Sequence, residues 1–287
     1  MAPPKPDARS TTVSYHQAVN VTLNQPIALG RTAEVHAWRE DTVLKLYYEW
    51  CPPHWAGNEA KVAQAVVAAG IPTPAALEVL EVNGRRGIVY ERVTGISMLQ
   101  DMNARPWTGF RHARALAELQ AKINALSVPG LYSYREGLAD AIRRAPHLSD
   151  DLRASVLDLL PTLPNDARLC HGDFHPGNIM LTDKGPVVID WMTARIGSPW
   201  ADFTRTSLLL TIGPKGAGKQ VSPIVRLVIQ LFYRSYSHRY LELLPDPQNE
   251  RGKWIPIIAA ARLEERIEPE IQALVAMVTS GMKQKHQ

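Results

Sequence analysis

The chain has 287 residues, enough for one large domain or for two lobes that each bury a core. Hydrophobic residues make up 45% of the chain and charged residues 21%, which is ordinary globular usage and excludes a disordered, collagen-like or coiled-coil protein. The net charge of +4 is small and dispersed, so it does not predict a nucleic-acid partner.

The cysteines and the N-terminal residues allow a prediction of the cellular compartment. Cys51 and Cys170 lie far apart and belong to no CxxC or Cys/His set, so we expect neither a disulfide framework nor a zinc site. Residues 1–12 are polar and Pro-rich, which predicts a flexible tail rather than a signal peptide. No run reaches the roughly 18 apolar residues of a membrane span. We therefore expect a cytoplasmic protein with no membrane partner, and the sequence predicts no oligomeric state.

The region from 13 to 94 is predicted to be rich in strands. Short runs at 27–29, 34–38 and 42–47 are separated by turn residues, which favours a small antiparallel sheet. An Ala-rich helical pattern over 55–69 stops at Gly70, before two prolines. The dipeptide Asn83-Gly84 predicts a hairpin between strands at 76–82 and 85–91.

Beyond Gly95 the pattern becomes mostly helical, interrupted by a strand-like region over 169–190. The predicted helical segments are 107–126, 136–144, 149–160, 200–211, 221–244 and 258–280. We therefore predict two lobes, one over 13–94 and one over 95–287.

The strand-like region carries the residues most suggestive of chemistry. It reads Leu-Cys-His-Gly-Asp-Phe-His-Pro-Gly-Asn-Ile-Met over 169–180, followed by Val-Val-Ile-Asp-Trp over 187–191. Alone, Asp173 or Asn178 could be a turn residue. An Asp, an Asn five residues later and Asp190 after a strand together match the parts needed for phosphoryl transfer, where carboxylate and amide oxygens orient a hydroxyl and hold Mg²⁺.

The motifs HGDFHPGN and IDW resemble the catalytic and metal loops of the aminoglycoside phosphotransferase and choline kinase family, relatives of the protein kinases. The resemblance implies an α+β, bilobal, protein-kinase-like fold with a small antiparallel-sheet N-lobe and a larger, mostly helical C-lobe. It implies that Asp173 is the catalytic base, that Asn178 and Asp190 are Mg²⁺ ligands, and that His171 organises the loop. His175 lies inside the same motif, and we assign it a structural role.

The segment Gly197-Ser-Pro-Trp-Ala-Asp202 resembles the position of a further aspartate in this family. The resemblance implies that Asp202 is a buried brace for the catalytic loop. An N-cap for the helix that follows is the alternative.

Two residues of the N-lobe resemble the nucleotide pair of the same family. Strand alternation places Lys45 on the same side as Val43, and Glu59 follows in the next helix. Considered alone, Lys45 could be an exposed strand lysine, and Glu59 could be a solvated charge on a helix. The resemblance implies that Lys45 holds the phosphates of ATP and that Glu59 fixes the ammonium group.

Gly30 and residues 91–93 complete the predicted nucleotide site. Gly30 stands where a phosphate-covering loop is expected, but it is a single glycine, and a plain hairpin turn explains it equally well. The segment Tyr90-Glu-Arg-Val-Thr-Gly95 resembles the hinge, where backbone groups from Glu91 to Val93 would bind adenine.

Residues 213–220 offer a competing motif, because Gly-Pro-Lys-Gly-Ala-Gly-Lys-Gln fits GxxxxGK. Gln220 stands where a P-loop has Ser or Thr, so the hydroxyl that would bind Mg²⁺ is missing. The preceding run continues a helical pattern, whereas a P-loop follows a buried strand. We read the segment as a loop between helices.

The sequence thus predicts an ATP- and Mg²⁺-dependent kinase that phosphorylates a hydroxyl of a small molecule. Residues 191–287 hold 13 Lys and Arg against 8 Asp and Glu, which disfavours a polycationic aminoglycoside and favours a sugar, an amino alcohol or a related metabolite. Aromatic residues there could form a box for a choline-like cation, although such spacings are more often core. The alternatives are a catalytically silent nucleotide-binding scaffold and a P-loop NTPase using 213–220.

Overall fold

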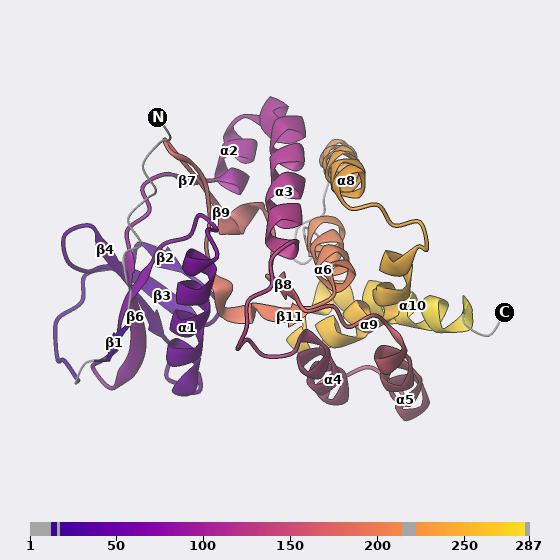
Figure 1. Cartoon of the computed structure of the whole chain (residues 1–287), viewed down its shortest axis with the longest axis horizontal. Coiled ribbons are helices and arrows are strands. Elements are labelled where there is room, and N and C mark those ends of the chain that lie inside the picture. Colours follow the sequence, from indigo (N-terminus) through magenta and orange to yellow (C-terminus); the bar gives the residue numbers. More distant parts are fainter. Residues whose placement is uncertain (1–12, 16–17, 214–221, 285–287) are drawn as a thin grey trace, which may run out of the picture. The chain divides into compact units, whose positions relative to one another are not determined.

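A computed structural model describes residues 13–15, 18–213 and 222–284 (Figure 1). The chain divides into two compact units. The first comprises Met1–Gly95 and Met180–Met192, and the second comprises Ile96–Ile179 and Thr193–Gln287.

The first unit contains a six-stranded sheet, one helix and a short hairpin. Its elements are β1 (Ser14–Tyr15), β2 (Ala28–Leu29), β3 (Ala33–Ala37), β4 (Thr42–Tyr47), α1 (His54–Ala68), β5 (Ala76–Val82), β6 (Arg85–Glu91), β9 (Ile179–Thr182) and β10 (Gly185–Val188). The sheet order is β1-β5-β6-β4-β3-β2, in which β1 pairs in parallel with β5 and every other pair is antiparallel.

The β5–β6 hairpin has the bounds that its turn predicts. Asn83 and Gly84 both have positive φ, 50° and 80°, and this is the backbone that a two-residue hairpin turn requires. Gly84 supplies the conformation without strain, because it has no Cβ. The local sequence is therefore sufficient to fix this part of the sheet.

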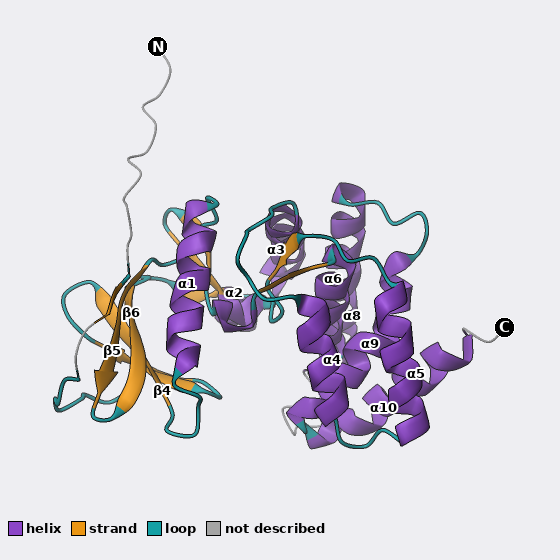
Figure 2. Ribbon diagram, turned by 60° about the horizontal axis from the view of Figure 1, so that its bottom comes forward, coloured by secondary structure: helices purple, strands orange, loops and turns teal. Residues whose placement is uncertain are grey.

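Both faces of the sheet are covered, and successive side chains of β4 point to opposite faces. Leu44 and Leu46 are fully buried on one face, while Val43 and Tyr47 pack on the other with residues of α1. Figure 2 shows α1 alongside β4, β5 and β6. Alternation along β4 then places Lys45 on the α1 face, among apolar side chains.

The hairpin of β9 and β10 packs with the first unit, whereas the sequence alone assigns 180–192 to the helical lobe. Hydrogen bonds explain the difference. The Val188 N–H donates to the Pro72 carbonyl at 2.8 Å, and the Thr73 hydroxyl donates to the Val188 carbonyl at 2.7 Å. The Trp191 indole N–H reaches Thr73 Oγ1 at 2.8 Å. These contacts attach the segment that carries Asp190 to the first unit.

The second unit is mostly helical. Its elements are β7 (Ile96–Ser97), α2 (Met98–Ala104), α3 (Gly109–Asn124), α4 (Tyr134–Arg144), α5 (Asp150–Leu159), β8 (Arg168–Cys170), β11 (Arg195–Gly197), α6 (Pro199–Thr211), α8 (Pro223–Leu243), α9 (Glu250–Arg262) and α10 (Glu268–Gln284). β8 and β11 form an antiparallel pair.

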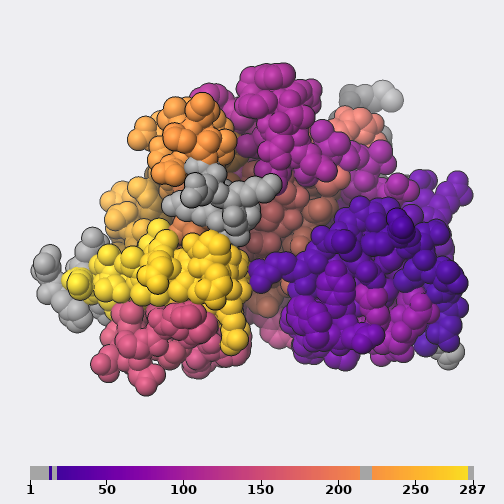
Figure 3. Space-filling model, turned by 180° about the vertical axis from the view of Figure 1, so that it is seen from behind, coloured from indigo at the N-terminus to yellow at the C-terminus, as the bar shows by residue number. Residues whose placement is uncertain are grey.

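Helix α9 is the centre of the second unit's core. Residues 256–262 of this helix are all buried, and α9 packs against α4, α5, α6 and α10. In Figure 3, α10 (yellow) runs along the surface of this unit. The aromatic side chains considered for a cation box are mostly core: Trp254 is 2% exposed, and Tyr236 and Tyr240 are fully buried.

One helix prediction for this unit is wrong, and one helix was not predicted. A single helix over 258–280 is replaced by α9 and α10, with Arg266 at φ 54° between them. Pro269 explains the break, because proline suits the first turn of a helix and disrupts its interior. Helix α2 was not predicted at all, although Ser97 and Gln100 form a capping box at its start.

The predicted tail over 1–12 and, apart from Gly213, the GxxxxGK motif over 213–220 lie outside the described residues. Among the helices that are described, none has the length and apolar character to cross a membrane.

Candidate active site

Lys45 and Glu59 form a buried ion pair in the first unit. Lys45 Nζ lies 2.8 and 2.9 Å from the two carboxylate oxygens of Glu59, so the pair is bidentate on the carboxylate. The side chain of Glu59 is 2% exposed and that of Lys45 is 14% exposed. The strand–helix order of β4 and α1 therefore brings the two predicted nucleotide residues into direct contact.

Asp190 completes a three-residue charge cluster. Its Oδ1 lies 2.8 Å from Lys45 Nζ, and its side chain is 41% exposed, so the carboxylate is the accessible part of the cluster. Asp190 has a φ of 65°, a conformation that is uncommon outside glycine. Backbone strain of this kind gathers at sites whose surroundings hold a residue for a function.

Two tyrosine hydroxyls hold the far side of Glu59. Tyr47 donates to Glu59 Oε2, and Tyr90 lies 3.1 Å from Oε1. Burial, and then the negative charge of Glu59, raise the pKa of both phenols, so both remain protonated donors. Sequence reasoning missed them, although Tyr47 shares the strand face of Lys45 and so carried a detectable signal.

Charge balance keeps Lys45 protonated. Burial alone would lower its pKa, but the carboxylates of Glu59 and Asp190 outweigh burial and hold the pKa above its usual value. The ammonium group also lies 5.6 Å from the centre of the Tyr47 ring. Lys45 is therefore a fixed cation at neutral pH.

In the second unit, Asp173 lies in the loop after β8 and is held by residues of its own motif. Asn178 donates through Nδ2 to the Asp173 carbonyl at 2.9 Å and to Oδ2 at 3.3 Å. His175 Nδ1 accepts the Gly177 N–H at 3.0 Å, so the ring proton is placed on Nε2, 3.6 Å from Asp173 Oδ2. The motif thus sets the orientation of the carboxylate.

The surroundings of Asp173 favour its ionised form. Burial alone would raise its pKa, but the interaction with His175 and the positive charge of Arg205 outweigh burial and hold the pKa well below its usual range. A carboxylate of this kind accepts a hydrogen bond at neutral pH and is a weak base. It is suited to orienting a hydroxyl group more than to removing its proton from the ground state.

Both backbone polar groups of Gly172, the residue directly before Asp173, are hydrogen-bonded. Its N–H donates to Asp202 Oδ1 at 2.8 Å, and its carbonyl accepts from Arg205 Nε at 3.2 Å. Gly172 has a φ of 79°, and a Cβ there would lie 2.8 Å from the Thr193 carbonyl oxygen. Only glycine fits this position without a shift of the backbone. The position of Arg205 was not predicted from the sequence.

His171 and Asp202 are both fully buried. His171 Nδ1 accepts the Asp173 N–H at 3.2 Å, and the His171 carbonyl accepts from the Thr193 hydroxyl at 2.8 Å. Asp202 lies in the first turn of α6, whose N-cap is Ser198, and its carboxylate bonds the Gly172 peptide. Ser198, and not Asp202, is therefore the N-cap of α6, and the role of Asp202 as a brace for the loop stays a prediction.

The remaining predicted nucleotide residues have less distinctive surroundings. Gly30 lies in the β2–β3 turn, where its N–H donates to the Ala33 carbonyl at 2.8 Å. Glu91 ends β6, and its Oε2 accepts the Ala75 N–H at 3.3 Å. Val93 follows two residues later and is half-buried. Their roles in binding a nucleotide stay predictions.

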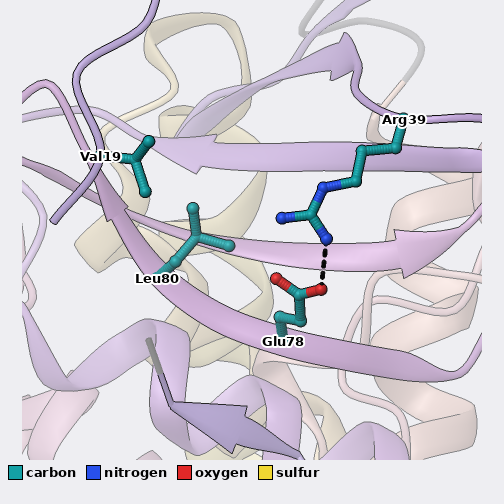
Figure 4. Close-up of a pocket in the computed structure, with 4 residues that line it drawn as sticks. All are labelled: Val19, Arg39, Glu78 and Leu80. Carbon is teal, nitrogen blue, oxygen red and sulfur yellow. Dashed lines mark hydrogen bonds and ion pairs between the residues drawn. The ribbon is translucent and has the colours of Figure 1, made fainter. Parts of the chain in front are cut away.

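A hollow of about 320 Å³ in the first unit lies elsewhere (Figure 4). It is lined by Val19, Arg39, Glu78 and Leu80, and Arg39 pairs with Glu78 at 2.6 Å. Leu80 belongs to the apolar cluster on the sheet face away from α1. The hollow therefore does not include the Lys45 cluster.

The donor chemistry of the predicted metal ligands fits Mg²⁺. Asp190 offers a half-exposed carboxylate, and the amide nitrogen of Asn178 is engaged by Asp173, which identifies its oxygen as the remaining acceptor. Within the described residues no group of three or more His, Cys, Asp or Glu could hold a metal ion. In proteins Mg²⁺ is commonly held by one or two carboxylates and by substrate phosphates.

The sequence matches the profile of a family described as the phosphotransferase enzyme family (APH) over residues 25–226. The chain belongs to this family. The predicted family is thereby confirmed. No curated protein matches the chain in a sequence search.

Solved structures agree on the fold of this phosphotransferase family member. A choline/ethanolamine kinase family protein from Mesorhizobium loti is 17% identical, with a TM-score of 0.54 over 92% of this chain and 86% of that one. An ADP-bound aminoglycoside phosphotransferase, APH(2'')-Ib, is 14% identical, with a TM-score of 0.57 over 91% and 93%. A mutant APH(4)-Ia in complex with AMP-PNP and hygromycin B is 18% identical, with a TM-score of 0.53 over 90% of each chain. The protein-kinase-like fold is thereby confirmed.

Proposed function

We propose that this phosphotransferase uses ATP and Mg²⁺ and transfers the γ-phosphoryl group to a hydroxyl of a small molecule. The observation that carries the proposal is the cluster in which Lys45 lies between Glu59 and Asp190. A buried ammonium group fixed by a buried carboxylate, beside an accessible carboxylate on a strained backbone, is the arrangement that phosphoryl transfer needs for phosphates and their metal.

Each residue of the first unit has a distinct task in this proposal. Lys45 binds phosphate oxygens as a point charge, and Glu59 keeps the ammonium group in place. Asp190 would hold Mg²⁺, which when bound neutralises charge on the phosphates, and Asn178 stays a predicted Mg²⁺ ligand. Backbone groups near Glu91 and Val93 would bind the base.

Asp173 would act on the acceptor. Its ionised carboxylate accepts a hydrogen bond from the hydroxyl and points an oxygen lone pair at the phosphorus. The transferring group requires little covalent help from the protein, so positioning accounts for most of the effect. The low pKa of Asp173 suits such a role.

The charge of the chain favours acceptors other than aminoglycosides. Residues 191–287 carry more lysine and arginine than aspartate and glutamate, 13 against 8, and Arg205 contributes positive charge near Asp173. A polycation would be repelled by this balance. We therefore propose a sugar, an amino alcohol or a related metabolite as the acceptor.

An ADP-release assay over hydroxylated metabolites and aminoglycosides tests the proposal, with Asp173→Asn as the blank. We expect turnover that needs Mg²⁺ and falls about 10²-fold or more in the variant, the usual effect of a positioned acid–base group. Wild-type turnover in a folded Asp173→Asn protein would overturn the role of Asp173. Efficient phosphorylation of kanamycin-type drugs alone would overturn the acceptor class.

A further inference from the structure

Asp202 is a fully buried carboxylate that accepts hydrogen bonds from three neutral groups of the described part of the chain. Oδ1 accepts the Gly172 N–H at 2.8 Å. Oδ2 accepts the side-chain amides of Gln120 and Asn124, each at 3.0 Å. Both amides come from α3, one helical turn apart. The charge that fixes the Gly172 peptide is therefore stabilised by two oriented amides.

Two tyrosines of α8 contribute to the orientation of these amides, together with the Thr206 hydroxyl, which accepts from Gln120 Nε2 at 3.0 Å, and the Leu169 carbonyl, which accepts from Asn124 Nδ2 at 2.8 Å. Tyr236 donates its hydroxyl to Gln120 Oε1, and Tyr240 donates to Asn124 Oδ1 at 2.7 Å. A hydroxyl donor on the amide oxygen leaves the amide N–H groups directed at Asp202. If that donor were lost, the amide oxygen would be left without this partner, and only the acceptors of the amide N–H groups would still oppose a rotation that presents the oxygen to the carboxylate.

The hydroxyls keep this direction because both phenols stay protonated. Burial chiefly, and the nearby charge of Asp202, raise the pKa of Tyr236 and Tyr240. Tyr134 and Cys170, which the charge of Asp202 also influences, are likewise buried with raised pKa values and remain neutral. The hydrogen bonds thus run one way, from phenol to amide to carboxylate.

We propose that Gln120, Asn124, Tyr236 and Tyr240 are positioning residues for the reaction, and that through Asp202 and the Gly172 peptide they set the orientation of Asp173. The inference rests on the proposed function of Asp173. The four residues form a relay, the tyrosine–amide relay, that joins α8 and α3 to the catalytic loop. Rotation of either amide would remove a donor from Asp202 Oδ2 and displace the carboxylate whose Oδ1 accepts the Gly172 N–H, which would let Asp173 turn away from the acceptor.

The double variant Tyr236→Phe/Tyr240→Phe removes both hydroxyls and retains both rings. We expect kcat to fall by about 10²-fold, the effect of a misplaced catalytic group, with little change in KM for ATP. Phe203→Leu is the matched control, because Phe203 packs against both tyrosine rings, at centroid distances of 5.6 and 4.7 Å, and has no polar side-chain atom. It should lower the melting temperature and leave kcat within about twofold. Wild-type kcat in the double variant, or an equal loss in the control, would overturn the proposal.

Asn124→Asp provides a readout that loss of stability would not produce. Two carboxylates at this distance share one proton at low pH, and the shared proton replaces the amide as the donor to Asp202. As the pH rises the proton leaves, the two charges repel, and kcat of the variant should fall relative to wild type. Asn165→Asp, in an exposed loop, adds the same charge and should keep the wild-type profile. Parallel profiles for both variants would contradict the relay.

Amide hydrogen exchange of residues 169–174 separates this inference from the proposed function, because it needs no activity. Exchange should be faster in Tyr236→Phe/Tyr240→Phe than in Phe203→Leu, since only the former releases the Gly172 N–H. Equal exchange in the two variants would refute the relay, whatever the reaction. If exchange were faster in the double variant but the wild-type protein showed no phosphotransfer, the contact between the relay and the loop would be supported. The proposed function would then be refuted instead.

Discussion

Lys45 and Asp190 are 145 positions apart in the chain, and their side chains form an ion pair with 2.8 Å between Nζ and Oδ1. Glu59 holds the same ammonium group from α1. One lysine therefore serves two carboxylates, one buried and one accessible. The arrangement separates two tasks, because Glu59 fixes the position of Lys45 while Asp190 faces outward on a strained backbone.

Replacement of Lys45 by methionine should affect both stability and nucleotide binding. The variant leaves the buried Glu59 without its cation, and loss of one partner of a buried ion pair costs about 3 kcal/mol in the free energy of unfolding. It also removes the phosphate ligand, so Mg·ATP binding should be lost. Urea unfolding and calorimetric titration measure the two effects.

The double variant Lys45→Met/Glu59→Gln separates those effects. It removes both charges of the pair, so most of the lost stability should return while Mg·ATP binding stays lost. Lys61→Met, on the exposed side of α1, is the control and should change neither quantity. Recovery of nucleotide affinity in the double variant would refute a direct role for Lys45.

Tyr47 and Tyr48 are neighbours with different expected effects. Tyr47→Phe removes a buried donor from Glu59, and a buried acceptor that loses its partner costs about 1–3 kcal/mol. Tyr48→Phe removes only a 3.3 Å bond to the Gly30 carbonyl on an exposed edge, and should cost less than about 0.5 kcal/mol. Equal losses of unfolding free energy in the two variants would show that the Tyr47 hydroxyl does not support Glu59.

Sequence reasoning reached the parts of the site that local pattern determines. Strand alternation placed Lys45 on one face, and the next helix had to cover that face and bring Glu59 to it. The motif around Asp173 is similarly self-contained, since Asn178 and His175 contact it from within five residues. Such contacts can be predicted from a short segment of sequence and the periodicity of its strand or helix.

The residues that the sequence did not predict depend on tertiary packing. Gln120 and Tyr236 are 116 positions apart, and they meet because α3 and α8 pack side by side. One feature of the sequence could have indicated these residues. Gln120 and Asn124 are polar residues on the buried face of α3, beside Leu116, Ala117 and Ile123. Buried amides at helical spacing require partners, although the sequence does not say which.

His175→Gln should shift the acid limb of the pH–rate profile. Burial alone would raise the pKa of Asp173, and the interaction with His175 opposes burial. Without His175 that pKa should rise, so Asp173 would become protonated at a higher pH as the solution is acidified. The acid limb of kcat/KM therefore moves to higher pH, and the rate near neutral pH changes less.

His238→Gln is the control for this shift, because the His238 side chain is 75% exposed and pairs with Glu242. Its profile should coincide with that of the wild type. Glutamine at 175 can still accept the Gly177 N–H, so the turn over Pro176–Asn178 is expected to persist. An acid limb that stays in place, or moves to lower pH, would contradict the assigned influence of His175 on Asp173.

Gly172→Ala and Gly84→Ala form a matched pair for the catalytic loop. The two glycines have nearly the same φ, 79° and 80°, but a Cβ at 84 meets nothing within 4 Å, whereas a Cβ at 172 lies 2.8 Å from the Thr193 carbonyl oxygen. Both variants should lose about 1–2 kcal/mol of unfolding free energy from the left-handed backbone. Only Gly172→Ala has to move the peptide that Asp202 and Arg205 hold, so it should lose more stability and also about 10²-fold in kcat. If the two variants lost equal stability and both kept wild-type kcat, the clamp on the Gly172 peptide would have no part in positioning Asp173.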